Sequence, residues 1–209
     1  MATFDERARD WDTPERITRA TRVAAAIREA VPLRPTDRLV DVGAGTGLLG
    51  LALADDVGEI VLSDPSAGMI EVATEKLVAS GLRSVQAVRH DLLVDQPPSD
   101  LFDVAVSLLV LHHLEDTAGA LAAIRDLLVP GGRIALADLD TEDGTFHSAD
   151  ADGIHHRGFD RAALARLATA AGFEDVATRT AMVIDDGGAS GGFPVFLLTG
   201  RRPPDQASG

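Results

Sequence analysis

Apolar residues along this chain form short continuous runs, and segments with helical spacing separate these runs. The runs predict buried strands near residues 38–42, 59–63, 84–89, 102–107 and 132–138. The segments between them predict helices near residues 46–54, 66–80 and 115–129. Strands that alternate with helices usually form a parallel sheet covered on both faces, so the sequence predicts a doubly wound α/β fold.

The two ends of the chain extend this pattern. Thr13 and Pro14 begin a predicted helix that Pro32 ends. Toward the C-terminus we expect a helix near 160–171, a strand around 175–183 and, after a glycine-rich turn, the apolar run FPVFLLTG. The length of 209 residues fits a single domain, which we place at residues 1–200. Residues 201–209 are polar and rich in proline, which predicts a disordered tail.

The segment Leu39 to Leu53, LVDVGAGTGLLGLAL, contains three alternating glycines within an apolar run. This pattern predicts a strand, a tight turn and a helix. Gly43, Gly45 and Gly47 can adopt positive φ angles and carry no side chain, so a ligand can lie against bare backbone at the helix N-terminus. We therefore expect a nucleotide-like cofactor. The dinucleotide fingerprint G-x-G-x-x-G/A is not matched, because its sixth position is Leu48.

Acidic residues follow the second and third predicted strands. Asp64 lies about twenty residues past the glycines, where a carboxylate can accept hydrogen bonds from ribose hydroxyls. Asp91 ends the segment VQAVRHD, and the runs FDVAVSLLVLHHL and LLVPGGRIALADLD follow it. The alternatives are that Asp64 caps the helix near Ser66 and that Asp91 is an ordinary turn residue.

These motifs, in this order between Asp37 and Asp138, resemble class I S-adenosylmethionine-dependent methyltransferases. The resemblance implies a final antiparallel hairpin and a sheet of seven strands. It implies a cofactor site made of Asp41, Gly43, Gly45, Gly47, Asp64, Pro65, Met69, Asp91 and Leu92. In that site Asp64 holds the ribose, Asp91 accepts a hydrogen bond from the adenine amino group, and Met69 and Leu92 sandwich the ring.

Three regions are candidates for the acceptor side of the site. Residues 1–35, with Phe4, Trp11 and Arg16, resemble a segment that folds over the cofactor in similar enzymes; the alternative for Trp11 is burial against the first helix. The second region is His112-His113, and the third is the loop 140–158, which contains His147, His155 and His156. Imidazole titrates near neutral pH, and the chain has no tyrosine or cysteine. We therefore predict His112, and after it His147, as the proton-accepting residue.

The loop 140–158 also has to be considered as a metal site. Asp138, Asp140 and Glu142 fit the first three ligand positions of a calcium loop, but Asp143 occupies its obligatory glycine position. A second frame that starts at Ser148 lacks the bidentate glutamate. We therefore predict no metal site, although the sequence leaves open whether the histidines of residues 140–158 bind the acceptor or a metal.

Composition restricts the partners and the compartment. The formal charge of −14, from 33 acidic and 19 basic residues, argues against a nucleic acid acceptor, because phosphate binding needs a basic surface. The chain has no cysteine, no apolar core of a signal peptide and no apolar run long enough for a membrane span, so we expect a cytoplasmic protein.

The sequence thus predicts an S-adenosylmethionine-dependent methyltransferase that acts on a small molecule. Two alternatives stay open: a nicotinamide-dependent reductase, and a protein that binds S-adenosylmethionine without transferring the methyl group. The absence of tyrosine removes the tyrosine acid used by one large group of reductases. The acceptor and the oligomeric state are not determined by the sequence.

Overall fold

The computed structural model describes residues 3–146, 153–185 and 191–205. The helices are α1 (Phe4–Arg7), α2 (Pro14–Ala30), α3 (Leu48–Ala52), α4 (Ala67–Ser80), α5 (Thr117–Asp126) and α6 (Arg161–Ala170), with the short 3₁₀ helices η1 (Ala8–Asp10) and η2 (Leu111–His113). The strands are β1 (Arg38–Val42), β2 (Glu59–Asp64), β3 (Val85–Arg89), β4 (Phe102–Leu108), β5 (Leu128–Leu139), β6 (Glu174–Ile184) and β7 (Phe193–Arg201).

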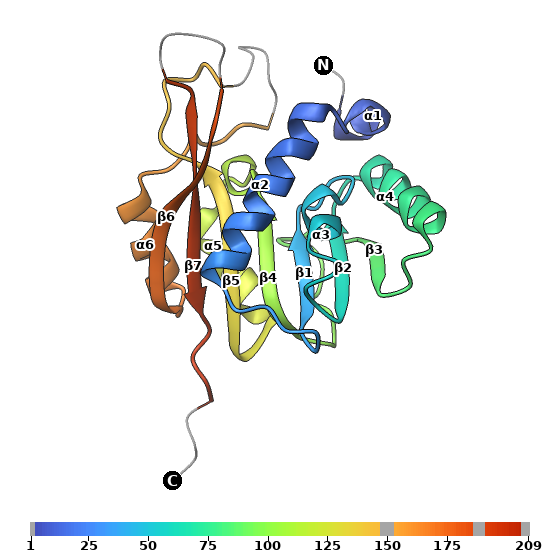
Figure 1. Ribbon diagram of the computed structural model, residues 1–209. Coiled ribbons are helices and arrows are strands. Elements are labelled where there is room, and N and C mark those ends of the chain that lie inside the picture. Colours follow the sequence, from blue (N-terminus) through green and yellow to red (C-terminus); the bar gives the residue numbers. More distant parts are fainter. Residues whose placement is uncertain (1–2, 147–152, 186–190, 206–209) are drawn as a thin grey trace.

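The strands form one seven-stranded sheet in the order β3-β2-β1-β4-β5-β7-β6 (Figure 1). Strands β1 to β5 pair in parallel, whereas β7 is antiparallel to both β5 and β6. The predicted seven-stranded, mostly parallel sheet with a C-terminal antiparallel hairpin is therefore confirmed. The strand order reverses between β1 and β4, and the carboxyl ends of strands at such a point form a crevice where ligands bind in open α/β sheets.

Helices cover both faces of the sheet (Figure 1). On one face, Val23 and Ile27 of α2 share a hydrophobic cluster with residues of α3 and α4. On the other face, Leu121 of α5 and Leu164 of α6 pack in a second cluster around Phe196. Each helix thus buries its apolar stripe against the sheet, which leaves the loops at the carboxyl edge available for a binding site. None of the helices in the described ranges is long and apolar enough to cross a membrane.

Two differences from the sequence prediction arise from pairing in the sheet. Strand β5 begins at Leu128, before the Pro-Gly-Gly turn, because Leu128 pairs with Phe102 across an irregularity in the β4-β5 ladder. At the C-terminus, Arg201 pairs with Arg133 in the sheet. The backbone N–H of Arg202 donates to the carbonyl of Gly132 at 2.7 Å. These contacts hold residues that the sequence prediction assigned to a disordered tail, and residues 206–209 lie outside the described ranges.

Candidate cofactor and acceptor site

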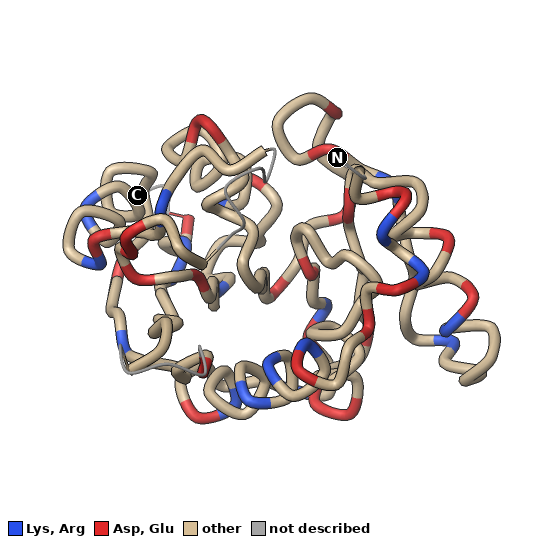
Figure 2. Tube along the Cα trace, turned by 90° about the horizontal axis from the view of Figure 1, so that it is seen from above, with Lys and Arg blue, Asp and Glu red and all other residues tan. Residues whose placement is uncertain are grey.

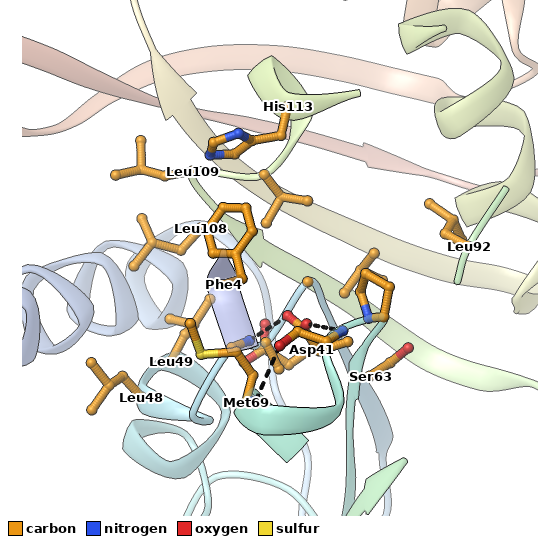
Figure 3. Close-up of a pocket in the computed structure, with 18 of the residues that line it drawn as sticks. Phe4, Asp41, Leu48, Leu49, Ser63, Met69, Leu92, Leu108, Leu109 and His113 are labelled. Carbon is orange, nitrogen blue, oxygen red and sulfur yellow. Dashed lines mark hydrogen bonds between the residues drawn. The ribbon is translucent and has the colours of Figure 1, made fainter. Parts of the chain in front are cut away.

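A cavity of about 250 Å³ lies at the carboxyl edge of the sheet, between the glycine turn and the N-terminal segment. Its walls come from the ends of β1, β2 and β4, the start of α4, the segment after β3, and residues of α1 and α2. Figure 3 shows Phe4, Leu108, Leu109 and His113 grouped on one side of this space, with Leu49 and Met69 across from them. The cavity therefore joins most of the regions that the sequence motifs indicated.

The three alternating glycines have different neighbours. All three have positive φ angles: 66° at Gly43, 56° at Gly45 and 86° at Gly47. A Cβ atom would lie 2.6 Å from Val110 at Gly43 and 2.6 Å from Leu62 at Gly47, so these two glycines permit close packing. A Cβ atom at Gly45 would lie 3.6 Å from Nε1 of Trp11 and 3.8 Å from the sulfur of Met69, which are ordinary contact distances. Gly45 is thus the position where a ligand can approach the backbone most closely.

Asp64 is buried at the end of β2 and lines the cavity. Its Oδ2 accepts a hydrogen bond from the Gly45 N–H at 2.8 Å, and its Oδ1 accepts one from the Ser66 N–H at 2.9 Å. Burial raises the pKa of Asp64, and the hydrogen bonds from Ser66 and Gly45 oppose this effect. The helix cap is Ser66, whose side chain accepts from the Met69 N–H. Asp64 therefore joins the glycine turn to the start of α4, facing the cavity.

Asp41 is 1% exposed and lies beneath the glycine turn. Its Oδ2 accepts a hydrogen bond from the Gly50 N–H in the first turn of α3, at 2.8 Å. Burial raises the pKa of Asp41 to about 7; the Gly50 hydrogen bond lowers it, and the neighbouring carboxylate of Asp64 adds to the increase. Asp41 thus stabilises the start of the helix that borders the cavity.

The raised pKa of Asp41 predicts a pH-dependent stability. In the unfolded chain this carboxyl ionises near pH 4, whereas in the folded protein it keeps its proton until about pH 7. Its contribution to the free energy of unfolding is therefore fully present below pH 4 and is lost as the pH rises to about 7. In Asp41→Asn the amide oxygen accepts the same hydrogen bond without ionising. In urea titrations, we expect the stability of Asp41→Asn relative to the parent to increase by about 3 kcal/mol between pH 5 and pH 8. An unchanged difference would contradict this account.

The predicted adenine side of the site lies beyond β3. Asp91 and Leu92 both line the cavity. The Oδ1 of Asp91 accepts a hydrogen bond from the Leu93 N–H at 3.0 Å. Asp91 therefore also acts as a turn residue, which was the alternative interpretation of this position. Met69, 1% exposed, and Pro65 line the cavity from the start of α4 and the end of β2. Figure 3 shows Leu92 on the opposite side of the view from Leu48 and Leu49.

The N-terminal segment covers the cavity and is attached to α4 at its first turn. The Oδ1 of Asp5 accepts hydrogen bonds from the Ser66 hydroxyl at 2.5 Å and from the Gly68 N–H at 2.9 Å. A Cβ atom at Gly68 would lie 2.7 Å from the Asp5 carbonyl oxygen. This close approach therefore requires glycine at position 68.

A second attachment lies on the glycine turn. The Thr46 hydroxyl donates to Oδ1 of Asp12 at 2.5 Å, and Lys76 forms an ion pair with the same carboxylate. Lys76 also donates to the Thr46 carbonyl at 2.8 Å. Residues 5–12 are thus held at both ends, above the turn that borders the cavity.

Gly68→Ala is expected to release this segment without unfolding the domain. Alanine favours the helical backbone of α4, but its methyl group collides with the Asp5 backbone. We expect the amides of Phe4 to Trp11 to lose protection from hydrogen exchange by about tenfold, since a hydrogen-bonded contact of about 1.4 kcal/mol is lost. Thr74→Ala, an exposed change on the same helix, is the control. Unchanged exchange in Gly68→Ala would show that the segment is not held here.

Aromatic residues of the N-terminal segment form the roof of the cavity. Phe4 meets Trp11 edge to face at 5.7 Å and His113 at 5.4 Å between ring centroids. The guanidinium of Arg16 lies 4.0 Å from the centroid of Trp11 and donates to the Trp11 carbonyl at 2.9 Å. Trp11 is therefore part of the cavity wall.

His112, the first candidate for the proton-accepting residue, does not lie on the wall of the cavity. Its side chain is 1% exposed and does not line the cavity; its Nδ1 lies 2.7 Å from Oδ1 of the buried Asp138. The residue that lines the cavity is His113. The two side chains lie in the short 3₁₀ turn η2, where adjacent residues point in different directions. His147, the second candidate base, lies outside the described residues.

His112 instead supports the acceptor-side loop through its backbone. Its carbonyl accepts hydrogen bonds from the N–H groups of His155 and His156, at 3.0 Å and 3.1 Å. His113 Nδ1 lies 2.8 Å from the Gly153 carbonyl. A carbonyl can only accept, so Nδ1 carries the proton and Nε2 is the basic nitrogen of His113. No group of three or more His, Asp or Glu side chains suited to a metal ion occurs in the described part of the chain.

Arg19 and Leu109 are among the cavity residues that were not predicted from the sequence. Leu109 follows β4 with a φ of 58°, a left-handed conformation that costs an L-residue about 1–2 kcal/mol. Its N–H donates to the Ala137 carbonyl at 2.8 Å, which fixes the bend that leads the chain from β4 into η2. No sequence signal marks this bend. Arg19 lies three residues after Arg16, on the same side of the predicted helix, and this spacing would have indicated it.

Comparison with known proteins identifies relatives of this chain. Residues 15–178 match the family described as Methyltransferase domain. The chain is 36% identical over 110 residues to the ubiquinone/menaquinone biosynthesis C-methyltransferase of Teredinibacter turnerae, covering 51% of this chain and 44% of that protein. It is 35% identical over 116 residues to the ubiquinone biosynthesis O-methyltransferase of Xylella fastidiosa, covering 54% of this chain and 46% of that protein. The chain thus spans about half the length of these curated relatives.

The fold is also similar to a solved structure. The protein in complex with the Haloferax volcanii Trm112 methyltransferase activator superposes with a TM-score of 0.78 at 20% identity, covering 97% of this chain and 99% of that chain. At this identity the similarity shows the fold alone.

Proposed function

Because this chain belongs to the methyltransferase domain family, as its motifs predicted, we propose that it transfers a methyl group from S-adenosylmethionine to a small-molecule acceptor. The observation that carries the proposal is the hydrogen bond from the Gly45 N–H to the Asp64 carboxylate. A carboxylate suited to ribose hydroxyls is hydrogen bonded at 2.8 Å to the one glycine of the turn that leaves space for a ligand. Both residues line the same cavity.

The residues of the cavity fit the parts of this cofactor. The glycine turn would face its methionine and ribose end, Asp64 would accept from the ribose, and Asp91 would accept from the adenine amino group. The apolar side chains of Met69 and Leu92 would contact the adenine ring. When bound, the cofactor supplies a methyl group that its sulfonium has already activated.

The remaining task of this chain is to orient the acceptor and to exclude water, because methyl transfer is an in-line displacement. Phe4 and Trp11, held over the cavity by the N-terminal segment, would exclude water. His113 would accept a proton at Nε2 from an acceptor hydroxyl or ammonium. An acceptor that has no proton to lose does not need this base.

The net charge and the relatives both bear on the acceptor. The charge of −14 does not suit a nucleic acid, and acidic and basic positions are interspersed along the chain trace (Figure 2). The names of the two relatives include both a C-methyltransferase and an O-methyltransferase of quinone biosynthesis. We therefore propose a small-molecule acceptor without assigning the methylated atom.

Transfer is tested with S-adenosylmethionine labelled in its methyl group and a small-molecule extract, in the presence of active or heat-inactivated protein. We expect label in the low-mass organic fraction with active protein only. Label that remains on the cofactor, in a protein that binds S-adenosylhomocysteine, would favour the alternative of a protein that binds without transfer. Label on RNA or protein would contradict the small-molecule acceptor.

A further inference from the structure

Helix α2 presents two guanidinium groups to the cavity, those of Arg16 and Arg19. Arg16 stacks on Trp11 and donates to its carbonyl. Arg19 is half-buried, and its guanidinium lies 5.8 Å from the ring centroid of Phe146. Its buried Nε has no hydrogen-bond partner among the described residues. Within the same ranges, neither arginine forms an ion pair with a carboxylate.

Two other half-buried arginines of the chain are paired with carboxylates. Arg133 forms an ion pair with the buried Asp37 at 2.8 Å, and Arg161 forms one with Asp140 at 2.5 Å. Burial lowers the pKa of Arg19, and the neighbouring charge of Arg16 lowers it further. A buried cation without an anion is costly, so an unpaired guanidinium in a cavity wall indicates that an anion comes from a ligand.

Two arginines can hold two anions, whereas S-adenosylmethionine has only one carboxylate. Trp11 lies between Arg16 and the glycine turn, since its Nε1 is 3.6 Å from the Cβ position of Gly45. Arg16 is therefore placed for the carboxylate at the methionine end of the cofactor. Arg19 lies about one turn further along α2, and its guanidinium lies near the ring of Phe146, a residue of the acceptor-side loop.

We propose that Arg19 binds an anionic group of the acceptor, a carboxylate or a phosphate. This inference rests on the proposed function, because it assigns the second anion to the acceptor of the same reaction. Arginine suits this role, since its planar fork donates two parallel hydrogen bonds to a carboxylate or phosphate. The acceptor would then be an acidic small molecule held between α2 and Phe146.

Simple aromatic anions test the assignment in protein saturated with S-adenosylhomocysteine. Benzoate and phenyl phosphate are the anionic probes, and benzamide is the neutral probe of similar shape. Their affinities are measured by calorimetry for the parent, Arg19→Met, Arg19→Lys and Arg22→Met. Methionine keeps most of the length of the side chain without its charge, and Arg22 is an exposed arginine of the same helix that does not line the cavity.

We expect at least one anion to bind the parent at least tenfold more tightly than benzamide. This preference should disappear in Arg19→Met, persist in part in Arg19→Lys and be unchanged in Arg22→Met. Tighter binding of benzoate would assign the anionic group of the acceptor as a carboxylate, and tighter binding of phenyl phosphate would assign it as a phosphate. Equal binding of all three probes, or a preference that survives in Arg19→Met, would overturn the inference.

A tenfold loss of S-adenosylhomocysteine affinity in Arg19→Met would assign Arg19 to the cofactor and would also overturn the inference. Failure of the parent to bind S-adenosylhomocysteine would instead contradict the proposed function.

Discussion

Asp64→Ala is expected to weaken the binding of S-adenosylhomocysteine by about 10- to 150-fold, or about 1.5–3 kcal/mol. The proposed ribose hydroxyls lose a charged acceptor, and the Gly45 N–H loses the partner that fixes the turn. The folded domain should tolerate the change, because burial already raises the pKa of this carboxyl and so makes its charged form costly. Calorimetry measures the affinity, and circular dichroism checks the fold.

Asp126→Ala is the matched control for this substitution. Asp126 is an exposed aspartate at the end of α5, outside the cavity, and its only ion pair is with its neighbour Arg125 among the described residues. Its removal should leave the affinity unchanged. Equal affinities in the parent and a folded Asp64→Ala protein would remove Asp64 from the cofactor site.

His112→Ala and His113→Ala are expected to have opposite effects. Removal of His112 leaves the buried Asp138 without its imidazole partner, so the protein should lose about 3–5 kcal/mol of stability. Removal of His113 should leave stability nearly unchanged and should lower turnover by about 10²-fold, if the acceptor must lose a proton. Urea denaturation measures the first effect and the methyl-transfer assay the second.

The pair of histidine variants can contradict the account in two ways. A stable His112→Ala protein with strongly reduced turnover would return the catalytic role to His112. Full turnover in His113→Ala would restrict His113 to packing against Phe4 and holding the Gly153 carbonyl.

The fold and the cofactor turn could be predicted from local patterns. Alternation of strand and helix signals a doubly wound sheet, and three alternating glycines before a helical segment signal a turn with positive φ angles. Asp41, Asp64, Asp91, Met69 and the glycines all line or border the cavity, because the ends of β1, β2 and β3 meet at one edge of the sheet.

The acceptor side could not be predicted in the same way. Exchanging the roles of His112 and His113 requires a shift of one residue in a 3₁₀ turn, and sequence spacing does not determine which of two adjacent side chains points inward. The bend at Leu109 depends on a hydrogen bond to Ala137 of a neighbouring strand. The spacing of Arg16 and Arg19 places both on one side of α2, but the contact of Arg19 with Phe146 depends on the tertiary fold, because Phe146 lies far away in the sequence.

Both remaining errors have a tertiary cause. Strand β5 begins before the Pro-Gly-Gly turn, because Leu128 pairs with Phe102 of β4. Arg202 is held because its side chain donates to the Leu128 carbonyl, which the polar and proline-rich composition of that segment does not reveal.

Calorimetric titration of the parent protein with S-adenosylhomocysteine and, separately, with NAD decides between the methyltransferase site and the reductase alternative. We expect a single site that binds S-adenosylhomocysteine, with no measurable NAD binding at the same protein concentration. Binding of NAD without binding of S-adenosylhomocysteine would contradict the methyltransferase site and would favour the reductase alternative.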